Sequence, residues 1–380
     1  MKRVTVLGGG MVGWTCAMDL ARIGALEVTL VDSRQAVLER AQARGVATLC
    51  ADLSSPAATT QVVADADVVL GALPSALGLQ TLRAMIDAGK TYCDISFMPE
   101  DARELHDLAR ERGVCAVTDC GVAPGVSNLL AGHAALQLDP CDNLEIYVGG
   151  LPVARHWPFE YKAGFAPGDV IEEYTRPARL VEHGAIVVKP ALSEPELIEF
   201  PGVGTLEAFN TDGLRSLAYT LKVPAMKEKT LRYPGHIELM RVLRELGLFS
   251  RTPIEVSGQR VVPLEVTSAL LFPKWTFAPG EADFTVMRVL ADGLQHGRRV
   301  RMTWDLLDRH DAREDVRSMS RTTAYAATSM VTLLARGAWT EPGVWTPELL
   351  AGQPGLVDDF LTEYARRGVT LTARVEPLPG

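Results

Sequence analysis

Three glycines and one acid near the start of the chain have the types and spacing of a loop that holds a dinucleotide. Gly8, Gly10 and Gly13 follow an apolar run at residues 4–7, and Asp32 comes 19 residues after Gly13. Glycines in this order permit a tight turn, a close approach of backbone to a pyrophosphate, and close packing of the next helix on the strand. The acid would accept hydrogen bonds from the adenosine ribose. We therefore expect a dinucleotide here, contacted by Gly8, Gly10, Met11, Val12, Gly13, Asp32 and Ser33.

The acid also indicates which dinucleotide binds. A carboxylate at Asp32 repels the 2′-phosphate of NADP, so NAD is the expected cofactor and NADP the less favoured one. Arg34, two residues later, would weaken that preference. The helix expected at residues 14–23 would present its unpaired N-terminal N–H groups to the pyrophosphate.

Strands and helices alternate through the first 120 residues. Further strands are expected at 27–31, 46–50, 68–72, 91–95 and 114–118, and helices at 79–88 and 102–112. Six strands that alternate with helices predict an α/β fold, a doubly wound parallel sheet of the Rossmann type. Ligands bind beyond the carboxyl ends of such strands. The loops that follow the strands are therefore expected to bring Asp52, Leu73, Pro74, Ser75 and Gly121 to the cofactor.

The sequence changes character after residue 125. Helices expected at 127–138, 168–174 and 237–246 are mixed with apolar strands at 145–152, 185–188 and 197–200, the first of them ending in a glycine turn. This pattern predicts a second, α+β domain on an open, largely antiparallel sheet. A helix rich in small residues at 318–339, closed by Gly337, is expected to pack back on the first domain. The predicted division is a dinucleotide-binding domain at 1–125 plus about 316–380, and a substrate and dimerisation domain at 126–315.

The composition excludes several other classes of protein. Hydrophobic residues make up 47% of the 380 and charged ones 22%, which is ordinary for a globular chain. A net charge of −9 gives no reason to bind nucleic acid or an anionic membrane. The sequence has no apolar run of the roughly 20 residues that span a bilayer and no signal-peptide pattern, so a cytoplasmic protein is expected. The six cysteines have neither zinc-ligand nor disulfide spacing, so no metal is expected.

Six collinear segments spread over nearly the whole chain are more specific than the glycine pattern. They are DISFMPE (94–100), DCGVAPGVSNLL (119–130), YVGGLP (147–152), IEEYTRPARLVEHG (171–184), LEAFNTDGLRS (206–216) and TLRYPGH (230–236). With these segments and the helix from Ser318, the chain resembles the saccharopine dehydrogenase-like family, and within it the lysine 6-dehydrogenases most of all.

The resemblance implies NAD-dependent oxidation of the ε-amine of L-lysine, with release of ammonia, by a homodimer. The product, 2-aminoadipate 6-semialdehyde, cyclises to a piperideine carboxylate. In the family's saccharopine reductase branch, polar residues stand where this chain has Phe97, Ala123 and Val148, which argues against saccharopine as the substrate. Two alternatives stay open. One is a dehydrogenase or reductase of another secondary amine, such as carboxynorspermidine, and the other is a protein that senses NAD(P) without catalysis.

The chemistry implied by the resemblance needs a base, and three residues could supply or orient it. His236, in the RYPGH motif at the start of a helix, is the first choice, because an imidazole is basic near neutral pH. Asp94 and Asp119 directly follow apolar strands and would orient the base or hold the substrate ammonium. The structural alternative for all three is the capping of a helix or the fixing of a loop.

The remaining candidates would bind the substrate or move protons near it. Lys162 would have a lowered pKa if its surroundings are apolar, and otherwise is a solvated lysine at a strand end. Arg215 and Arg232 are expected to clamp the substrate carboxylate in bidentate fashion, with a surface ion pair as the alternative. Phe97 and Tyr161 are expected to contact the substrate, and Gly149 to let backbone approach the cofactor.

Overall fold

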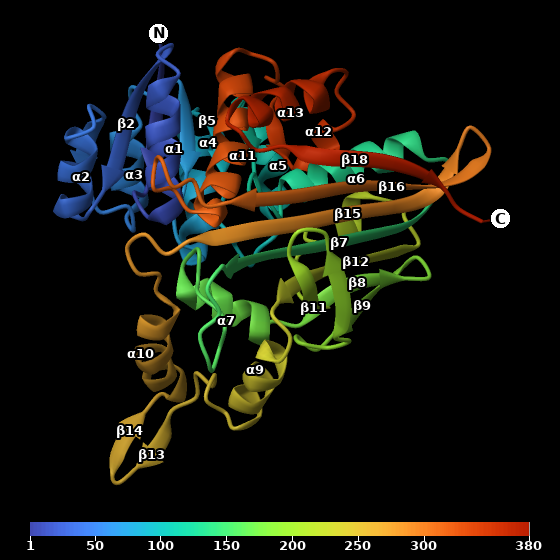
Figure 1. Ribbon diagram of the computed structural model, residues 1–380. Helices are drawn as coiled ribbons and strands as arrows, with labels where there is room; N and C mark the ends of the chain where they lie inside the picture. Colours follow the sequence, from blue (N-terminus) through green and yellow to red (C-terminus); the bar gives the residue numbers. More distant parts are fainter. Residues whose placement is uncertain (380) are drawn as a thin grey trace. The chain divides into compact units, whose positions relative to one another are not determined.

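The computed structural model describes residues 1–379, which form two compact units. The first unit comprises Met1–Leu136 and Ser320–Thr370, and the second comprises Gln137–Met319 and the residues from Leu371 on. Each unit contains one large sheet (Figure 1).

The sheet of the first unit is parallel throughout, as expected for a doubly wound fold. Its order is β17-β6-β5-β4-β1-β2-β3. The strands are β1 (Lys2–Leu7), β2 (Leu26–Asp32), β3 (Ala47–Cys50), β4 (Val68–Gly71), β5 (Thr91–Asp94), β6 (Cys115–Val117) and β17 (Gly343–Trp345). The six strands expected from the sequence are confirmed. The seventh, β17, was not predicted, because it has three residues and reaches the sheet from a distant part of the chain.

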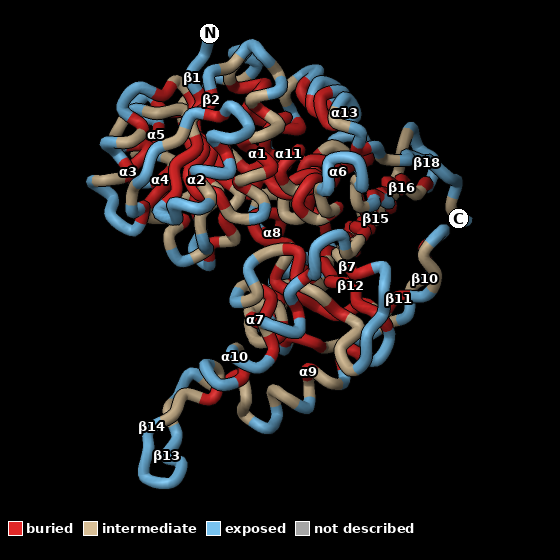
Figure 2. Tube along the Cα trace, turned by 60° about the vertical axis from the view of Figure 1, so that its left-hand side comes forward, coloured by how far each residue is buried: buried red, intermediate tan, exposed pale blue. Residues whose placement is uncertain are grey.

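Helices accompany this sheet along the chain. They are α1 (Met11–Arg22), α2 (Gln35–Gln42), α3 (Pro56–Val62), α4 (Gly78–Asp87), α5 (His106–Arg112), α6 (Val126–Gln137), α11 (Ser318–Ala335), α12 (Pro347–Leu350) and α13 (Leu356–Arg366), with the short 3₁₀ turns Ser75–Leu77 and Ala102–Leu105. Figure 2 shows buried residues concentrated in the strands and in the inner faces of these helices. The expected return of the late helix is confirmed, because the Cys93 thiol lies 3.8 Å from the carbonyl oxygen of Ala327 in α11.

The sheet of the second unit is mixed but largely antiparallel, as expected. Its main path is β10-β11-β12-β7-β15-β16-β18, and only β12 and β7 pair in parallel. The strands are β7 (Cys141–Pro152), β8 (Ala178–Glu182), β9 (Ala185–Lys189), β10 (Glu196–Phe200), β11 (Gly204–Asn210), β12 (Ala225–Arg232), β15 (Asp283–Gln295), β16 (Arg298–Arg309) and β18 (Leu371–Pro377). The glycine turn expected near residue 150 is absent, since Gly149 and Gly150 lie inside β7 opposite Val286 and Thr285.

The last strand corrects the expected extent of the first domain. Residues 371–377 form β18, whose register against β16 runs from Val300↔Pro377 to Leu306↔Leu371. The prediction of 316–380 for the first domain therefore extends too far. The physical reason is that β16 is a long strand with an open edge, and the final segment satisfies its hydrogen bonds.

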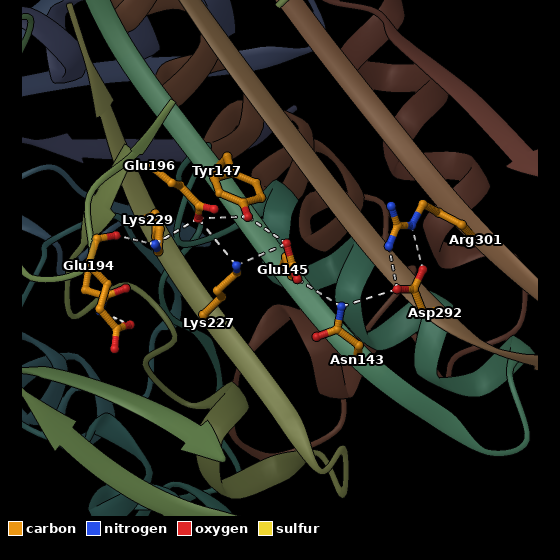
Figure 3. Close-up of polar contacts among 10 residues, drawn as sticks. Asn143, Glu145, Tyr147, Glu194, Glu196, Lys227, Lys229, Asp292 and Arg301 are labelled. Carbon is orange, nitrogen blue, oxygen red and sulfur yellow. Dashed lines mark hydrogen bonds and ion pairs between the residues drawn. The ribbon is translucent and has the colours of Figure 1, made fainter. Parts of the chain in front are cut away.

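The side chains of β7 and β12 divide between the two faces of the second sheet. Figure 3 shows one face, where Glu145 and Tyr147 of β7 meet Lys227 and Lys229 of β12. The Tyr147 hydroxyl donates to Glu145 Oε2 at 2.6 Å, and Lys229 Nζ lies 2.8 Å from Glu196 Oε1. Because side chains alternate along a strand, Val148 points to the other face. There it lies beside its β12 neighbour Thr230, so the second face of β12 carries Thr230 and Arg232.

Helices and a hairpin complete the second unit. They are α7 (Pro167–Thr175), α8 (Leu217–Thr220), α9 (His236–Glu245), α10 (Pro263–Trp275) and the two-stranded sheet of β13 (Ile254–Val256) and β14 (Gln259–Val261). The helices expected at 168–174 and 237–246 are confirmed within a residue at each end. Tyr161, Tyr174, Phe209 and Trp275 are the large side chains of the core between them.

The six cysteines all lie within the described residues 1–379. Five of the six cysteines are buried and Cys50 is exposed, and all six are free thiols. No group of three or more His, Cys, Asp or Glu side chains in this part of the chain is placed to hold a metal ion. None of its helices has both the length and the apolarity needed to cross a membrane.

We predict that the buried ion network around Arg367 stabilises the first unit. Its guanidinium donates to Asp19 in α1 (2.7 Å), to Glu363 in α13 (3.0 Å) and to Thr332 in α11 (3.1 Å). Arg367→Met would leave the Asp19 carboxylate, 12% exposed, without the guanidinium that pairs with it and would remove one of the three cations around Glu363, so it should lower the free energy of unfolding by about 3 kcal/mol.

The neighbouring Arg366 provides a matched control. Its side chain is 63% exposed although it also contacts Glu363, so Arg366→Met should change stability by less than about 0.5 kcal/mol. Urea denaturation of both variants measures the difference. Equal losses of unfolding free energy in the two variants would contradict a stabilising role for the buried ion network around Arg367.

Candidate active site

The glycine loop after β1 has the shape that a dinucleotide requires. Gly8 has a φ of +95°, and a Cβ on it would lie 2.5 Å from the Ala72 carbonyl oxygen. A Cβ on Gly13 would lie 2.0 Å from the Gly8 carbonyl oxygen. Gly10, the residue that caps α1, has open space where its Cβ would be. The first and third glycines therefore allow strand, loop and helix to approach one another, and the second leaves room for a phosphate at the helix N-terminus.

Asp32 at the end of β2 is tied to this loop. Its Oδ2 accepts from the Gly9 backbone N–H at 2.7 Å, and Arg34 donates to its two oxygens at 2.9 Å each. Burial of the carboxyl raises its pKa, but the hydrogen bonds and charge of Arg34 and the N–H of Gly9 outweigh this and lower the pKa to about 2. Asp32 is thus ionised at the position where an adenosine ribose would bind. The residues present fit an NAD(P) cofactor.

The other residues predicted to contact the cofactor lie in loops at the same edge of the sheet. Because all strands are parallel, the segments after β1, β2, β3 and β4 leave the sheet at its carboxyl edge. Met11, Ser33, Asp52 and Pro74 are exposed there, and Val12, Leu73 and Ser75 are half-buried. Their contact with the cofactor stays a prediction.

Asp94 at the end of β5 is a buried carboxyl held by three hydrogen bonds. It is 1% exposed, and it accepts from the Tyr92 hydroxyl (2.8 Å), the Ser96 hydroxyl (2.5 Å) and the Ser96 N–H (3.0 Å). Burial raises the pKa of Asp94 to about 7, although these hydrogen bonds oppose the rise. Its proton equilibrium therefore lies in the range where general bases work best.

A second buried carboxyl, Asp119, belongs to the neighbouring loop. The Cys120 N–H donates to the Asp94 carbonyl oxygen at 2.9 Å, which joins the loops after β5 and β6. The negative charge of Asp119 adds to the rise in the pKa of Asp94. Asp119 has a φ of +55°, a backbone conformation that an aspartate seldom adopts outside constrained loops. In the same loop, the backbone of Gly121 turns back to bridge Gly125.

In the second unit, His236 and Arg232 lie together in a buried polar cluster. Arg232 donates to Glu173 Oε2 at 2.5 Å and to the Tyr174 hydroxyl at 3.2 Å, and that hydroxyl lies 2.9 Å from His236 Nε2. His236 Nδ1 lies 2.8 Å from the Phe159 carbonyl oxygen. Because a carbonyl can only accept, Nδ1 carries the proton and Nε2 accepts from Tyr174.

This environment keeps the imidazole neutral. Burial, followed by the charge of Arg232, lowers the pKa of His236 to about 3, against the smaller opposing effect of the Phe159 carbonyl. The structure therefore gives no support to His236 as a base poised near neutral pH. It also shows Arg232 occupied by Glu173, where a clamp for the substrate carboxylate was expected.

Glu173 and Tyr174 are members of this cluster that the sequence analysis did not select. Both lie in the segment IEEYTRP, which was noted only for its family resemblance. Two adjacent acids in a helix are usually solvated, and the sequence did not indicate that Glu173 would point toward a buried arginine.

The other predicted residues of the second unit either pack beside the cluster of His236 and Arg232 or lie elsewhere in the unit. Tyr161 is buried, with its ring centroid 4.3 Å from the Arg232 guanidinium carbon. For Lys162, apolar surroundings and a solvated strand end were the two alternatives, and the structure shows an ion pair instead, in which Lys162 donates to Glu281 Oε2 at 2.5 Å and also to the Thr276 carbonyl oxygen. Arg215 is buried in the loop before α8, with a φ of +54°. A Cβ on Gly149 would lie 2.7 Å from the Leu231 carbonyl oxygen, so this glycine lets β12 approach β7.

Comparison with known proteins assigns both halves of the chain to one family. Two family models match nearly end to end, the Saccharopine dehydrogenase NADP binding domain at residues 4–117 and the Saccharopine dehydrogenase C-terminal domain at residues 121–369. Carboxynorspermidine synthase of Vibrio cholerae is 26% identical over 315 residues, which cover 76% of this chain and 74% of that protein. Carboxyaminopropylagmatine dehydrogenase of Synechocystis sp. is 22% identical over 394 residues, covering 97% and 96%.

Some relatives are much longer than this chain. It matches 29% of the length of the mouse α-aminoadipic semialdehyde synthase, with 26% identity over 271 residues and 66% of this chain covered. Among solved structures, saccharopine dehydrogenase (L-Glu forming) from Saccharomyces cerevisiae matches with a TM-score of 0.82 at 18% identity, covering 99% of this chain and 100% of that one. The two proteins share the same fold.

We predict that His236 makes the protein less stable in acid. Its pKa is about 3 when folded and about 6.5 in an unfolded chain. As the pH falls from 6.5 toward 3, the unfolded chain takes up a proton that the folded chain refuses, so the free energy of unfolding falls by up to ~1.4 kcal/mol per pH unit. His236→Gln should flatten this dependence by about that slope in urea denaturation at pH 4.5 to 7.5.

His183, an exposed histidine, is the control for this prediction. His183→Gln should leave the pH dependence as in the wild-type chain. If plots of unfolding free energy against pH run parallel for His236→Gln and wild type, His236 is not a buried neutral imidazole.

Proposed function

Since the chain belongs to the saccharopine dehydrogenase family and is an NAD(P)-dependent oxidoreductase, we propose that it oxidises the ε-amine of L-lysine with NAD. L-lysine, NAD and water would give 2-aminoadipate 6-semialdehyde, ammonia, NADH and one proton. The semialdehyde would then cyclise with its own α-amine to a piperideine carboxylate.

One observation carries the choice of lysine over saccharopine. Phe97, Ala123 and Val148 are apolar where the saccharopine branch of the family has polar groups, and all three are half-buried rather than in the core. Saccharopine has two more carboxylates than L-lysine, and both belong to the group attached to its ε-nitrogen. None of these three side chains can donate a hydrogen bond, and desolvating a carboxylate without a donor costs several kcal/mol. The ε-amine end of L-lysine, a primary amine on an aliphatic chain, carries no carboxylate.

The charge on Asp32 supports NAD as the cofactor. With a pKa of about 2, its carboxylate is ionised and would repel a 2′-phosphate while accepting from a 2′-hydroxyl. Arg34 offsets part of this repulsion, since its guanidinium pairs with the same carboxylate. We therefore expect a preference for NAD that is not absolute.

We assign proton transfer to Asp94. An amine must be neutral before its neighbouring carbon can release a hydride, so a base must take one proton from the ε-ammonium and later one from water. A carboxyl with a pKa of about 7 suits both steps, whereas an imidazole with a pKa of about 3 does not hold a proton at neutral pH. When bound, the cofactor supplies a nicotinamide ring as the acceptor of the hydride from carbon 6.

A secondary amine is the alternative substrate. It is favoured by the name of the Vibrio cholerae relative, carboxynorspermidine synthase, which matches three quarters of this chain. A polyamine acid has fewer carboxylates than saccharopine, so the apolar residues above argue against it less strongly.

The test of the proposal is NADH formation at 340 nm with a panel of amines. L-lysine, with one ammonia released for each NADH, is the expected substrate, and NADP should support a lower kcat/KM than NAD. Saccharopine, carboxynorspermidine and L-ornithine complete the panel. Activity with saccharopine or carboxynorspermidine and none with L-lysine would contradict the proposal.

The role of Asp94 predicts a particular pH profile. A general base must be deprotonated, so kcat/KM for L-lysine should rise with pH through about 7 and then level off. Asp94→Asn should lower kcat/KM by about 10²- to 10⁴-fold and abolish this rise.

Tyr92→Phe is the matched variant that separates proton transfer from structural support. Removing its hydrogen bond should raise the pKa of Asp94 and move the rise to higher pH, because that hydrogen bond stabilises the carboxylate. A profile that does not move would contradict the assignment of Asp94.

A further inference from the structure

The Asp32 carboxylate, which is expected to meet the adenosine ribose, already accepts four hydrogen bonds from the protein. Oδ1 accepts from the Arg34 backbone N–H at 2.8 Å and from Arg34 Nε at 2.9 Å. Oδ2 accepts from the Gly9 N–H at 2.7 Å and from Arg34 Nη2 at 2.9 Å. An ionised carboxylate has about four lone-pair sites, so a ribose hydroxyl can bind Asp32 only after one of these donors leaves.

The side chain of Arg34 is the donor that can leave. The two backbone N–H groups are held in place, because Gly9 lies in the loop between β1 and α1 and Arg34 caps α2 directly after β2 (Figure 1). The guanidinium is less constrained, since the Arg34 side chain is 59% exposed whereas that of Asp32 is 7% exposed. An ion pair with one solvated partner contributes little to stability, so a ligand can displace it at small cost.

Departure of the guanidinium would free one acceptor position on each oxygen of Asp32. Oδ1 would keep the hydrogen bond from the Arg34 backbone N–H, and Oδ2 would keep the one from Gly9. Two free positions match the two neighbouring hydroxyls, 2′ and 3′, that the adenosine ribose of NAD offers. The ribose of NADP offers the 3′-hydroxyl alone and brings a 2′-phosphate, whose negative charge the carboxylate repels.

The same guanidinium is suited to that phosphate. Arginine presents its N–H donors in a planar fork that matches the oxygens of a phosphate, and its charge does not depend on pH in the physiological range. Arg34 therefore has two possible anionic partners, the Asp32 carboxylate and the 2′-phosphate of NADP.

We propose that Arg34 competes with the adenosine ribose for Asp32 and thereby sets the choice between the two dinucleotides. For NAD the guanidinium is a competitor, because it must give up both oxygens of Asp32 to the two hydroxyls. For NADP it is a ligand, because it leaves Asp32 to pair with the 2′-phosphate. The side chain thus weakens the binding of one cofactor and strengthens the binding of the other. This inference rests on the proposed contact between Asp32 and the ribose, and it does not depend on which amine is oxidised.

Calorimetric titration of the intact protein with NAD and with NADP, in the absence of an amine substrate, tests the proposal. Arg34→Leu removes the side-chain donors and keeps the backbone N–H. It should tighten the binding of NAD by roughly 2- to 5-fold, because a partly exposed ion pair no longer competes. It should weaken the binding of NADP by ~10-fold or more, because charged hydrogen bonds to the phosphate are lost. Changes in the same direction for both cofactors overturn the proposal.

Arg112 provides the control. It lies in the last turn of α5, its side chain is 58% exposed, and it pairs with Asp87 at 3.8 Å, so it resembles Arg34 in exposure and in partner. Arg112→Leu should leave both dissociation constants unchanged, and shifts equal to those of Arg34→Leu overturn the proposal. A wild-type chain that binds neither dinucleotide overturns the proposed cofactor as well, whereas parallel changes in the two affinities overturn only the role of Arg34.

The salt dependence of the two affinities separates pairing from competition. The ratio of the two dissociation constants cancels the contribution of the pyrophosphate, which both cofactors share. Raising sodium chloride from about 20 mM to about 300 mM should weaken NADP relative to NAD in the wild-type chain, because salt screens the pairing of Arg34 with the phosphate. In Arg34→Leu the sign should reverse, since salt then screens the repulsion by Asp32, and Arg34→Lys should keep the wild-type sign. A ratio that responds to salt alike in wild type and Arg34→Leu contradicts the proposed role.

Discussion

The close approach of β1, its loop and α1 at two glycines is the constraint on which the rest of the first unit depends. A side chain at Gly13 would overlap the Gly8 carbonyl, and a side chain at Gly8 would overlap the Ala72 carbonyl at the end of β4. Only this packing places Gly10 at the cap of α1 with open space beside it. It also brings the Gly9 N–H within 2.7 Å of Asp32, so the same contact that closes the fold orients the acid for a ribose.

Burial and hydrogen bonding give three ionisable side chains very different pKa values. Asp32 has an arginine and an N–H group beside it, and its pKa falls to about 2. Asp94 has hydrogen bonds from uncharged groups and a neighbouring carboxylate, and burial raises its pKa to about 7. His236 is buried beside the Arg232 cation, and its pKa falls to about 3. These different surroundings, rather than the residue types, are the basis of the roles that we propose: cofactor orientation for Asp32, proton transfer for Asp94 and structural support for His236.

The sequence predicted the fold well because its signals are local. Apolar runs, glycines and an acid at a fixed offset specify one strand–loop–helix–strand unit at a time, and six strands follow from repeating that pattern. Strands β17 and β18 were harder to predict, since the short β17 and the exposed β18 owe their conformation to the strands that they pair with. The site was only partly predictable for the same reason. Position along the chain located Asp94, but not the Tyr92 hydroxyl that contacts it or the Glu173 carboxylate that occupies Arg232.

The most direct test of the account is the fate of deuterium from L-lysine labelled with two deuterons at carbon 6. If the ε-amine is oxidised, the reduced cofactor must carry deuterium from that carbon. The account predicts deuterated NADH and ammonia in equal amounts. Unlabelled NADH would show that the hydride comes from another carbon and would contradict the proposed reaction, as would the absence of any reduced cofactor.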